Sequence, residues 1–312
     1  MDDDSDIEVL QLVTTRRPFF EQQVQVLESR GISCTVLPVP QSSGDTRSVL
    51  DYARFHGQAL HRTVAGDFDV VHANYGLTAP IALTQPLRPV VLTLWGSDVL
   101  GRYGRVSEVC SSLCDAVIVM TDEMADQIDC DAHVIPHGID TERFTDEPAS
   151  WARSKVGWKR NAKHVLFPYD PSRSVKDYPR AESVVDVVDD RFDVPVELHA
   201  VYGVSHERVP IYMNAADALL LTSKREGSPN TVKEALACNL PVISTDVGDV
   251  SDLLADIDNC AVCQTDEELV RMLRQILESD EMVGGRDRVQ EFSLRHMGRE
   301  LRGVYDDVLS DS

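Results

Sequence analysis

Residues 216–234 read Ala-Asp-Ala-Leu-Leu-Leu-Thr-Ser-Lys-Arg-Glu-Gly-Ser-Pro-Asn-Thr-Val-Lys-Glu. The opening run, Ala216 to Leu221, is apolar and has the length of a buried strand. Ser228-Pro229 then supplies a capping side chain and a proline at the first helical position, so a helix is predicted to begin at about Ser228. A strand, a short loop and a helix in succession are typical of a parallel sheet flanked by helices. The stretch therefore predicts an α/β fold.

The same stretch places two carboxylates beside an anion site. The first N–H groups of a helix have no partner within it and lie at the positive end of its dipole. Gly227 has no side chain and lets a ligand approach the backbone. Glu234 falls about one and a half turns into the helix, and helical side chains lean toward the N-terminus, so its carboxylate should reach the same place as Glu226. Without the surrounding residues, two glutamates eight positions apart more often occupy a polar loop and the solvent-facing side of a helix.

Length and composition limit the class of protein. The chain has 312 residues, more than one hydrophobic core usually supports, so two domains are expected. Hydrophobic residues make up 43% of the chain, and no apolar run reaches the roughly 18 residues of a membrane span. Met1-Asp2-Asp3-Asp4 lacks the basic character of a secretory signal, so a cytoplasmic location is expected.

The chain is strongly acidic, with a formal net charge of −22 from 30 basic and 52 acidic residues. This charge opposes binding to nucleic acid, so no DNA or RNA partner is expected. The acidic residues are spread along the chain and lysine is scarce beside arginine. This pattern resembles the acidic proteome of halophilic organisms, which would make it an adaptation rather than a function.

The seven cysteines do not predict a disulfide framework, because their number is odd and no signal peptide is recognised. Cys260-Ala-Val-Cys263 has the spacing of a zinc or redox pair. It reads as an apolar strand without a second ligand pair, so buried small hydrophobic residues are the favoured interpretation. Cys110 and Cys114 have the spacing of one helix face.

Strand-length apolar runs alternate with helical stretches in two series, which predicts two doubly wound parallel sheets. Strands are expected at 7–13, 33–37, 69–72, 90–94, 116–119 and 133–135, then at 164–167, 196–200, 218–221, 241–244 and 259–263. Helices are expected in the gaps, including 19–30 and 49–64. The polar segment over about 141–160 is the predicted linker, and the stretch from about 286 to 309 has helical spacing.

Further motifs accompany Glu226-Gly-Ser-Pro-Asn230. Glu234-Ala-Leu-Ala-Cys-Asn-Leu-Pro-Val-Ile-Ser-Thr-Asp-Val-Gly248 follows it, and Val204-Ser-His-Glu-Arg-Val-Pro210 and Tyr212-Met-Asn-Ala-Ala-Asp217 precede it. Together they resemble the donor-site signature of retaining glycosyltransferases of family 4 (glycosyl transferases group 1), and the resemblance extends faintly over nearly the whole chain. It implies a GT-B fold, with two doubly wound Rossmann-like domains facing a central cleft. The implied domains are an acceptor-side domain at 1–145, a nucleotide-sugar donor-binding domain at 146–285 and a helix at 286–312 that returns to the first domain.

The resemblance also implies roles for individual residues. In that family an arginine and a lysine after the strand at 164–167 bind the donor pyrophosphate, and Arg173 and Lys176 occupy the matching positions. Two cations there would neutralise charge on the departing nucleotide. Glu226 would hold the sugar hydroxyls and Glu234 the ribose. The donor site is completed by Gly227, Ser228, Pro229, Asn230 and Thr231. As loop charges, Arg173, Lys176 and Glu226 are expected to contribute little to stability.

The chain departs from the family pattern twice in its first domain. It has Thr14-Thr-Arg-Arg-Pro-Phe-Phe20 where relatives carry a glycine-rich loop, and Trp95 where many have a histidine. Trp95 is more typical of a core residue than of a sugar platform, and His72 of a structural histidine. Asp98 is the residue expected to orient a substrate hydroxyl. Loss of the histidine need not abolish catalysis, because in the front-face mechanism the leaving phosphate takes the acceptor proton.

The predicted function is transfer of a sugar from a UDP- or GDP-linked nucleoside diphosphate sugar to a hydroxyl of a glycan, lipid carrier or small molecule. No cofactor is expected, and no essential metal, since the donor region has no Asp-x-Asp motif. The acceptor range leaves room for weak association with the inner face of a membrane. Two alternatives stay open: a GT-B nucleotide-sugar 2-epimerase and a non-catalytic nucleotide-sugar-binding partner subunit. A nicotinamide dehydrogenase is disfavoured, since no Gly-x-Gly-x-x-Gly follows the first strand.

Overall fold

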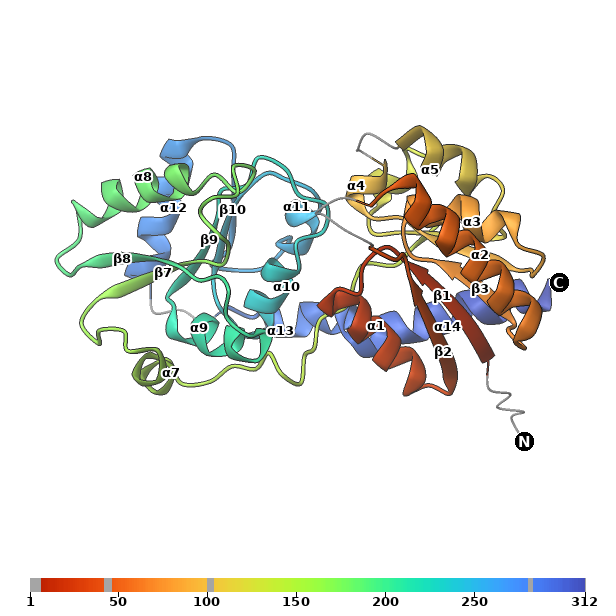
Figure 1. Ribbon diagram of the computed structural model, residues 1–312. Helices are drawn as coiled ribbons and strands as arrows, with labels where there is room; N and C mark the ends of the chain where they lie inside the picture. The colour runs from red at the N-terminus through yellow and green to blue at the C-terminus, as the bar shows by residue number, and fades with distance from the viewer. Residues whose placement is uncertain (1–6, 42–46, 100–103, 280–282, 312) are drawn as a thin grey trace. The chain divides into compact units, whose positions relative to one another are not determined.

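The computed structural model describes residues 7–41, 47–99, 104–279 and 283–311, which fold into two compact units (Figure 1). Unit 1 comprises Met1–Gly138 and Leu294–Ser312, and unit 2 comprises Ile139–Ser293. Each unit contains one parallel sheet with helices around it. The chain therefore passes from one unit to the other at 138 and 293, compared with the expected 145 and 285.

Unit 1 is built on a six-stranded sheet with the order β2-β1-β3-β4-β5-β6. Its strands are β1 (Ile7–Val13), β2 (Ile32–Pro38), β3 (Val70–Ala73), β4 (Val90–Thr93), β5 (Ala116–Val119) and β6 (His133–Val134). Its helices are α1 (Pro18–Glu28), α2 (Val49–Ala65), α3 (Ala79–Thr84), α4 (Gly96–Val99), α5 (Gly104–Ser111), α6 (Asp122–Ala125) and α14 (Leu294–Ser310). Every residue of β3, β4 and β5 is buried, as expected for parallel strands covered on both faces.

Helix α14, at the C-terminal end of the chain, packs into unit 1 (Figure 1). Leu301 and Tyr305 belong to the core that surrounds β1, and a Cβ at Gly298 would lie 2.9 Å from Val26 of α1, so the two helices approach closely. The expected helix over 286–309 is interrupted before Leu294. At Ser293 the chain is extended and forms a parallel bridge with Ile139, which a continuous helix would not allow.

Unit 2 is built on a five-stranded sheet with the order β11-β10-β9-β7-β8. Its strands are β7 (Lys163–Phe167), β8 (Val196–Ala200), β9 (Ala218–Leu221), β10 (Val242–Thr245) and β11 (Ala261–Cys263). Its helices are α7 (Ala149–Val156), α8 (Tyr178–Asp189), α9 (Val209–Ala215), α10 (Asn230–Ala237), α11 (Val250–Leu253), α12 (Asp266–Glu278) and α13 (Gly285–Arg288). Two buried apolar clusters form the core of this unit.

The expected linker over 141–160 is wrong for its central part, which forms helix α7 of unit 2. Ala152 is fully buried. Arg153 donates a hydrogen bond to the carbonyl of Ala215 at 2.9 Å and pairs with Asp217 at 2.8 Å, which holds α7 against the end of α9. The polar composition of the segment thus reflects a surface helix rather than a connection between domains.

The structure places two pairs of cysteines for which the sequence makes predictions. Helix α5 ends at Ser111, so Cys114 lies outside the helix that it was expected to share with Cys110. Burial raises the pKa of Cys260 and Cys263 to about 11, which suits small apolar residues.

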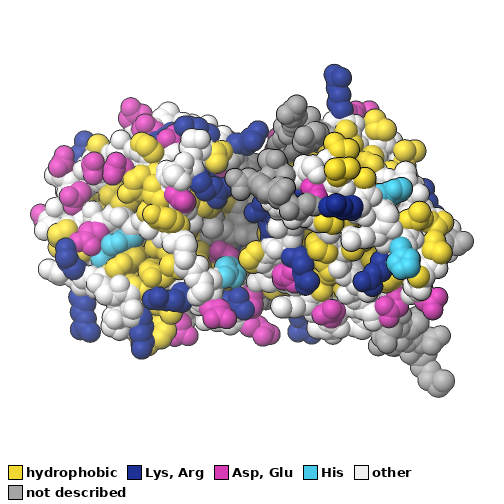
Figure 2. Space-filling view, in the orientation of Figure 1, with side chains coloured by type: hydrophobic (Ala, Val, Ile, Leu, Met, Phe, Trp, Pro, Cys, Tyr) yellow, Lys and Arg dark blue, Asp and Glu magenta, His cyan; other side chains and the backbone are white. Residues whose placement is uncertain are grey.

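On the face shown in Figure 2, acidic side chains are scattered rather than gathered into one patch. None of the helices in the described part of the chain combines the length and hydrophobicity of a membrane span.

Candidate functional site

Two loops of unit 2 leave the same edge of the sheet. Strands β7 and β9 are parallel neighbours, so the loops after Phe167 and Leu221 both follow carboxyl ends. The Thr222 hydroxyl donates to the carbonyls of Lys176 and Asp177, at 3.1 and 3.0 Å. These contacts hold the two loops together.

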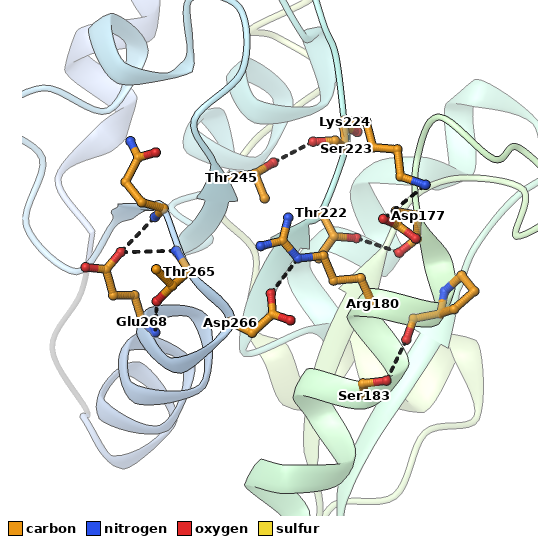
Figure 3. A network of polar contacts seen from close by, with 12 residues as sticks. Asp177, Arg180, Ser183, Thr222, Ser223, Lys224, Thr245, Thr265, Asp266 and Glu268 are labelled. Carbon is orange, nitrogen blue, oxygen red and sulfur yellow. Dashed lines mark hydrogen bonds and ion pairs between the residues drawn. The ribbon is translucent and has the colours of Figure 1, made fainter.

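Figure 3 shows how the second loop is held from both sides. On one side the Thr245 hydroxyl of β10 donates to the carbonyl of Ser223 at 2.7 Å. On the other, the Lys224 ammonium pairs with Asp177 at 3.2 Å. Below them, Arg180 of α8 pairs with Asp266 of α12 at 2.6 Å. These contacts anchor the start of the second loop, at residues 222–224, to its neighbours.

Lys176 and Glu226 form a nearly buried ion pair between these loops. The Lys176 ammonium contacts Oε1 of Glu226 and lies 3.6 Å from the centre of the Tyr169 ring. Burial lowers the pKa of Lys176, and the neighbouring Glu226 carboxylate opposes that shift. The Ser223 hydroxyl donates to the same Glu226 oxygen at 2.6 Å. The resemblance implies a phosphate for Lys176 and a sugar for Glu226, whereas the structure pairs the two side chains with each other.

Glu234 has a histidine partner that the sequence reasoning did not assign. Nε2 of His206 donates to Oε1 of Glu234 at 2.9 Å, and Arg143 lies 3.2 Å from the other ring nitrogen. Burial raises the pKa of Glu234, and the His206 hydrogen bond opposes the shift. His206 stands in the motif Val204–Pro210 quoted above, but no spacing rule connects it with Glu234.

Helix α10 begins at Asn230, so the expected start at Ser228 is wrong. Pro229 occupies the position before the helix, and no side chain caps it there. The Pro229 carbonyl accepts the N–H of Val232 at 3.0 Å, and the carbonyl of Gly227, just before this turn, accepts the N–H of Asp249 at 3.1 Å. Gly248 has φ +56°, and a Cβ there would lie 1.9 Å from the Gly227 carbonyl oxygen. Only glycine fits at Gly248.

The two loops and α10 meet at Tyr169. Its hydroxyl lies 2.6 Å from the hydroxyl of Thr231 in the first turn of α10. The Arg173 guanidinium is exposed and lies 5.7 Å from the Tyr169 ring. The structure thus gathers Arg173, Lys176, Glu226 and Thr231 around one ring, beside a helix N-terminus that favours anions.

Asp98 lies in unit 1 and is buried beside its own backbone. Its Oδ2 accepts the N–H of Trp95 at 2.9 Å, and burial raises its pKa to about 7. Trp95 is half-buried, and its ring centre is 4.7 Å from that of Phe19. His72 is enclosed between the hydroxyls of Tyr305 and Thr93, at 2.6 and 2.7 Å, and burial lowers its pKa to about 3. His72 is therefore a neutral structural residue, and the substrate role of Asp98 stays a prediction.

Comparison with known proteins gives two family matches that together cover most of the chain. The model described as Glycosyltransferase Family 4 matches residues 5–143, and Glycosyl transferases group 1 matches residues 192–290. The chain is 31% identical over 214 residues to TuaC of Bacillus subtilis (strain 168), whose name assigns it, as a glycosyltransferase, to teichuronic acid biosynthesis. That match covers 59% of this chain and 55% of TuaC, so the chain spans about half the length of this relative.

Solved structures agree in fold over nearly the whole chain. Sucrose-phosphate synthase from Thermosynechococcus elongatus superposes with a TM-score of 0.71 at 16% identity, covering 98% of this chain and 100% of that one. Anabaena Alr3699/HepE in complex with UDP and glucose gives 0.68 at 14% identity, covering 96% and 100%. A glycosyltransferase from Rickettsia africae ESF-5 gives 0.69 at 14% identity, covering 99% and 100%.

Proposed function

Because the chain belongs to the group 1 glycosyltransferases of family 4 and has their GT-B fold, we propose that it transfers a sugar from a nucleoside diphosphate sugar to an acceptor hydroxyl. The observation that carries the proposal is the cluster around Tyr169, where the Lys176–Glu226 pair lies beside the first turn of α10. It offers cations and helix N–H groups to a diphosphate and carboxylates to hydroxyls. UDP is the first nucleotide to test, because the Anabaena protein was solved with it, and GDP is the second.

Each side chain has a distinct role in this proposal. Arg173 and Lys176 bind the pyrophosphate, Glu226 binds hydroxyls of the donor sugar, and Glu234 binds the ribose. His206 is a positioning residue whose hydrogen bond orients the buried Glu234 and opposes the rise that burial causes in its pKa. Lys176 turns from Glu226 toward the phosphate when the donor enters, which frees the Glu226 carboxylate for the sugar.

We propose that the reaction retains the configuration of the anomeric carbon. The bond from the anomeric carbon to the diphosphate oxygen breaks, and a bond to the acceptor oxygen forms on the same face of the sugar. The acceptor proton passes to the departing diphosphate, so no histidine base is required at Trp95. Arg173 and Lys176 stabilise the charge that builds on the leaving group, which is the usual contribution of fixed cations to such steps. No essential metal is required.

The acceptor is a glycan, a lipid-linked carrier or a small molecule, and a polysaccharide intermediate is the first class to test because of the similarity to TuaC. We place the protein in the cytoplasm, with at most a weak association with the inner face of the membrane. Its acidic surface should repel anionic lipid, so such an association would strengthen as salt screens the charge.

A product assay with UDP- and GDP-sugars, with and without acceptors, tests the proposal. We expect a glycoside with the donor's anomeric configuration, read by NMR. Arg173→Ala should reduce transfer at least about 100-fold, whereas Arg160→Ala, an exposed arginine elsewhere in unit 2, should not. Epimerised donor without acceptor would indicate the 2-epimerase, and donor binding without any product would indicate the non-catalytic subunit.

A further inference from the structure

Three side chains on strands β7 and β8 have the spacing of metal ligands. In the parallel register of the two strands His164 is paired with Glu197, and His199 lies two residues further on. Nδ1 of His164 is 2.9 Å from Nε2 of His199. Oε2 of Glu197 is 3.8 Å from the first nitrogen and 3.7 Å from the second. Within the described ranges, no other group of His, Cys, Asp or Glu side chains meets this spacing.

These separations are close to those that a tetrahedral ion imposes. Zinc binds nitrogen and carboxylate oxygen at about 2.0–2.1 Å, which places ligand atoms roughly 3.3–3.4 Å apart in a tetrahedron. The observed distances of 2.9, 3.7 and 3.8 Å lie on both sides of that value. Side-chain shifts of about half an ångström would complete the geometry.

The partners around these groups orient the right atoms inward. Nε2 of His164 lies 2.7 Å from the carbonyl of Lys159, so it carries the proton, and the lone pair of Nδ1 faces the other two groups. The Lys159 ammonium contacts Oε1 of Glu197 at 2.6 Å and leaves Oε2 for a ligand. Trp158 stacks on the His199 ring at 3.8 Å. Such partners typically fix metal-binding histidines and carboxylates.

Solvent can reach the group from one side. The His164 side chain is fully buried, while the side chains of Glu197 and His199 are 27% and 20% exposed. An ion held by three protein atoms would therefore keep a fourth position for water. The group lies along β7 itself, whereas the loop after the carboxyl end of β7 carries Arg173 and Lys176. An ion here would not touch the proposed donor site.

We propose that His164, Glu197 and His199 bind a divalent transition-metal ion, with Zn²⁺ as the first choice. Two imidazole nitrogens and a carboxylate suit zinc better than Ca²⁺ or Mg²⁺, which prefer all-oxygen sites. Strand β8 is the edge strand of its sheet, and its neighbour there is β7. The ion would clamp β8 to β7, so its role is to stabilise the sheet and not to take part in sugar transfer.

The test uses the full chain, stripped with EDTA and dialysed, then titrated with Zn²⁺ by calorimetry and with Co²⁺ by absorption spectroscopy. We expect one equivalent, a higher thermal midpoint on binding, and tetrahedral Co²⁺ bands without thiolate charge transfer. His199→Ala and Glu197→Gln should each weaken binding by at least about 10- to 100-fold, because this is already the cost of losing a partner that only orients a metal ligand. His133→Ala, an exposed histidine of unit 1, is the matched control and should bind normally.

Three results would overturn the proposal: no binding by the parent chain, unchanged affinity in both ligand variants, or a thiolate band that assigns the ion to cysteines. Glu197→Gln keeps the size of the side chain, so it removes a ligand without removing packing. It therefore tests the site even if His199→Ala fails to fold. The apo thermal midpoint of each variant checks folding separately. None of these readouts depends on sugar transfer, so the metal site and the proposed activity can fail independently.

Discussion

Replacing one member of the Lys176–Glu226 pair should destabilise unit 2, and replacing both should restore most of the loss. The sequence suggested loop charges of little consequence for stability, which assumes that they are exposed. The structure contradicts that assumption for this pair, because Lys176 is 4% exposed and the Glu226 side chain 13%. Arg173 is exposed, so for its substitution a small effect on stability stays the prediction.

The magnitude follows from the charge that each substitution leaves behind. Removing one partner of a fully buried pair costs about 3–5 kcal/mol. Glu226 keeps some solvent and the Ser223 hydrogen bond, so we expect about 2 kcal/mol for Lys176→Met and for Glu226→Gln. The double variant leaves no uncompensated charge and should cost about 1 kcal/mol. The coupling free energy is then about 3 kcal/mol.

Urea unfolding followed by tryptophan fluorescence measures this cycle. The chain has three tryptophans, of which Trp151 and Trp158 lie in unit 2, so a Trp95→Phe background reports on that unit alone. This matters because two units can unfold in separate steps. A coupling below about 0.5 kcal/mol would refute the reasoning, since it would place the pair among ordinary surface ion pairs. Sugar transfer should stay low in the double variant although its stability returns, because the phosphate-binding cation is still missing.

Three further outcomes are expected. Gly248→Ala should displace Gly227 and weaken UDP binding by at least about tenfold, measured by calorimetry. The control is Gly203→Ala, which is also at positive φ but has open space around it. It should bind UDP normally and lose only about 1–2 kcal/mol of stability, measured by thermal unfolding. UDP affinity should fall as the pH is lowered through the raised pKa of Glu234, because the carboxylate becomes protonated. His206→Ala removes the hydrogen bond that opposes this protonation, so in that variant the fall should occur at higher pH. Binding titrations over a pH series measure the shift. EDTA should leave the initial rate of transfer at low temperature unchanged, and a strict dependence on added metal would contradict the donor site described above.

The strands were the most predictable part of the fold. The runs at 7–13, 116–119, 196–200 and 218–221 coincide with β1, β5, β8 and β9. Strands β5 and β9 are buried at every residue, and a parallel strand covered on both faces is apolar along its whole length. Helix ends were less predictable. The break before α14, for example, depends on the bridge between Ile139 and Ser293. Contacts between distant residues leave no local pattern in the sequence.

The candidate site, like the fold, could be predicted only where local sequence patterns determine it. Local motifs and the family resemblance pointed to Lys176 and Glu226, which stand on loops, and to Glu234, which lies within helix α10. They did not reveal that Lys176 and Glu226, 50 residues apart, pair with each other. Nor did they reveal His206 beside Glu234, since that contact depends on how two segments pack. The proposed metal ligands, likewise, become neighbours only through the register of β7 and β8.

The Lys176–Glu226 pair has a consequence for how the donor is recognised. A nucleoside diphosphate alone would draw Lys176 toward its phosphates and leave the Glu226 carboxylate without its cation, which costs free energy at a site with little solvent. A nucleotide sugar compensates that loss, because its hydroxyls donate to Glu226. UDP-sugar should therefore bind about tenfold more tightly than UDP, equivalent to about 1.4 kcal/mol. Glu226→Gln should remove most of that preference in calorimetric titrations, whereas an unchanged preference would mean that Glu226 does not sense the sugar.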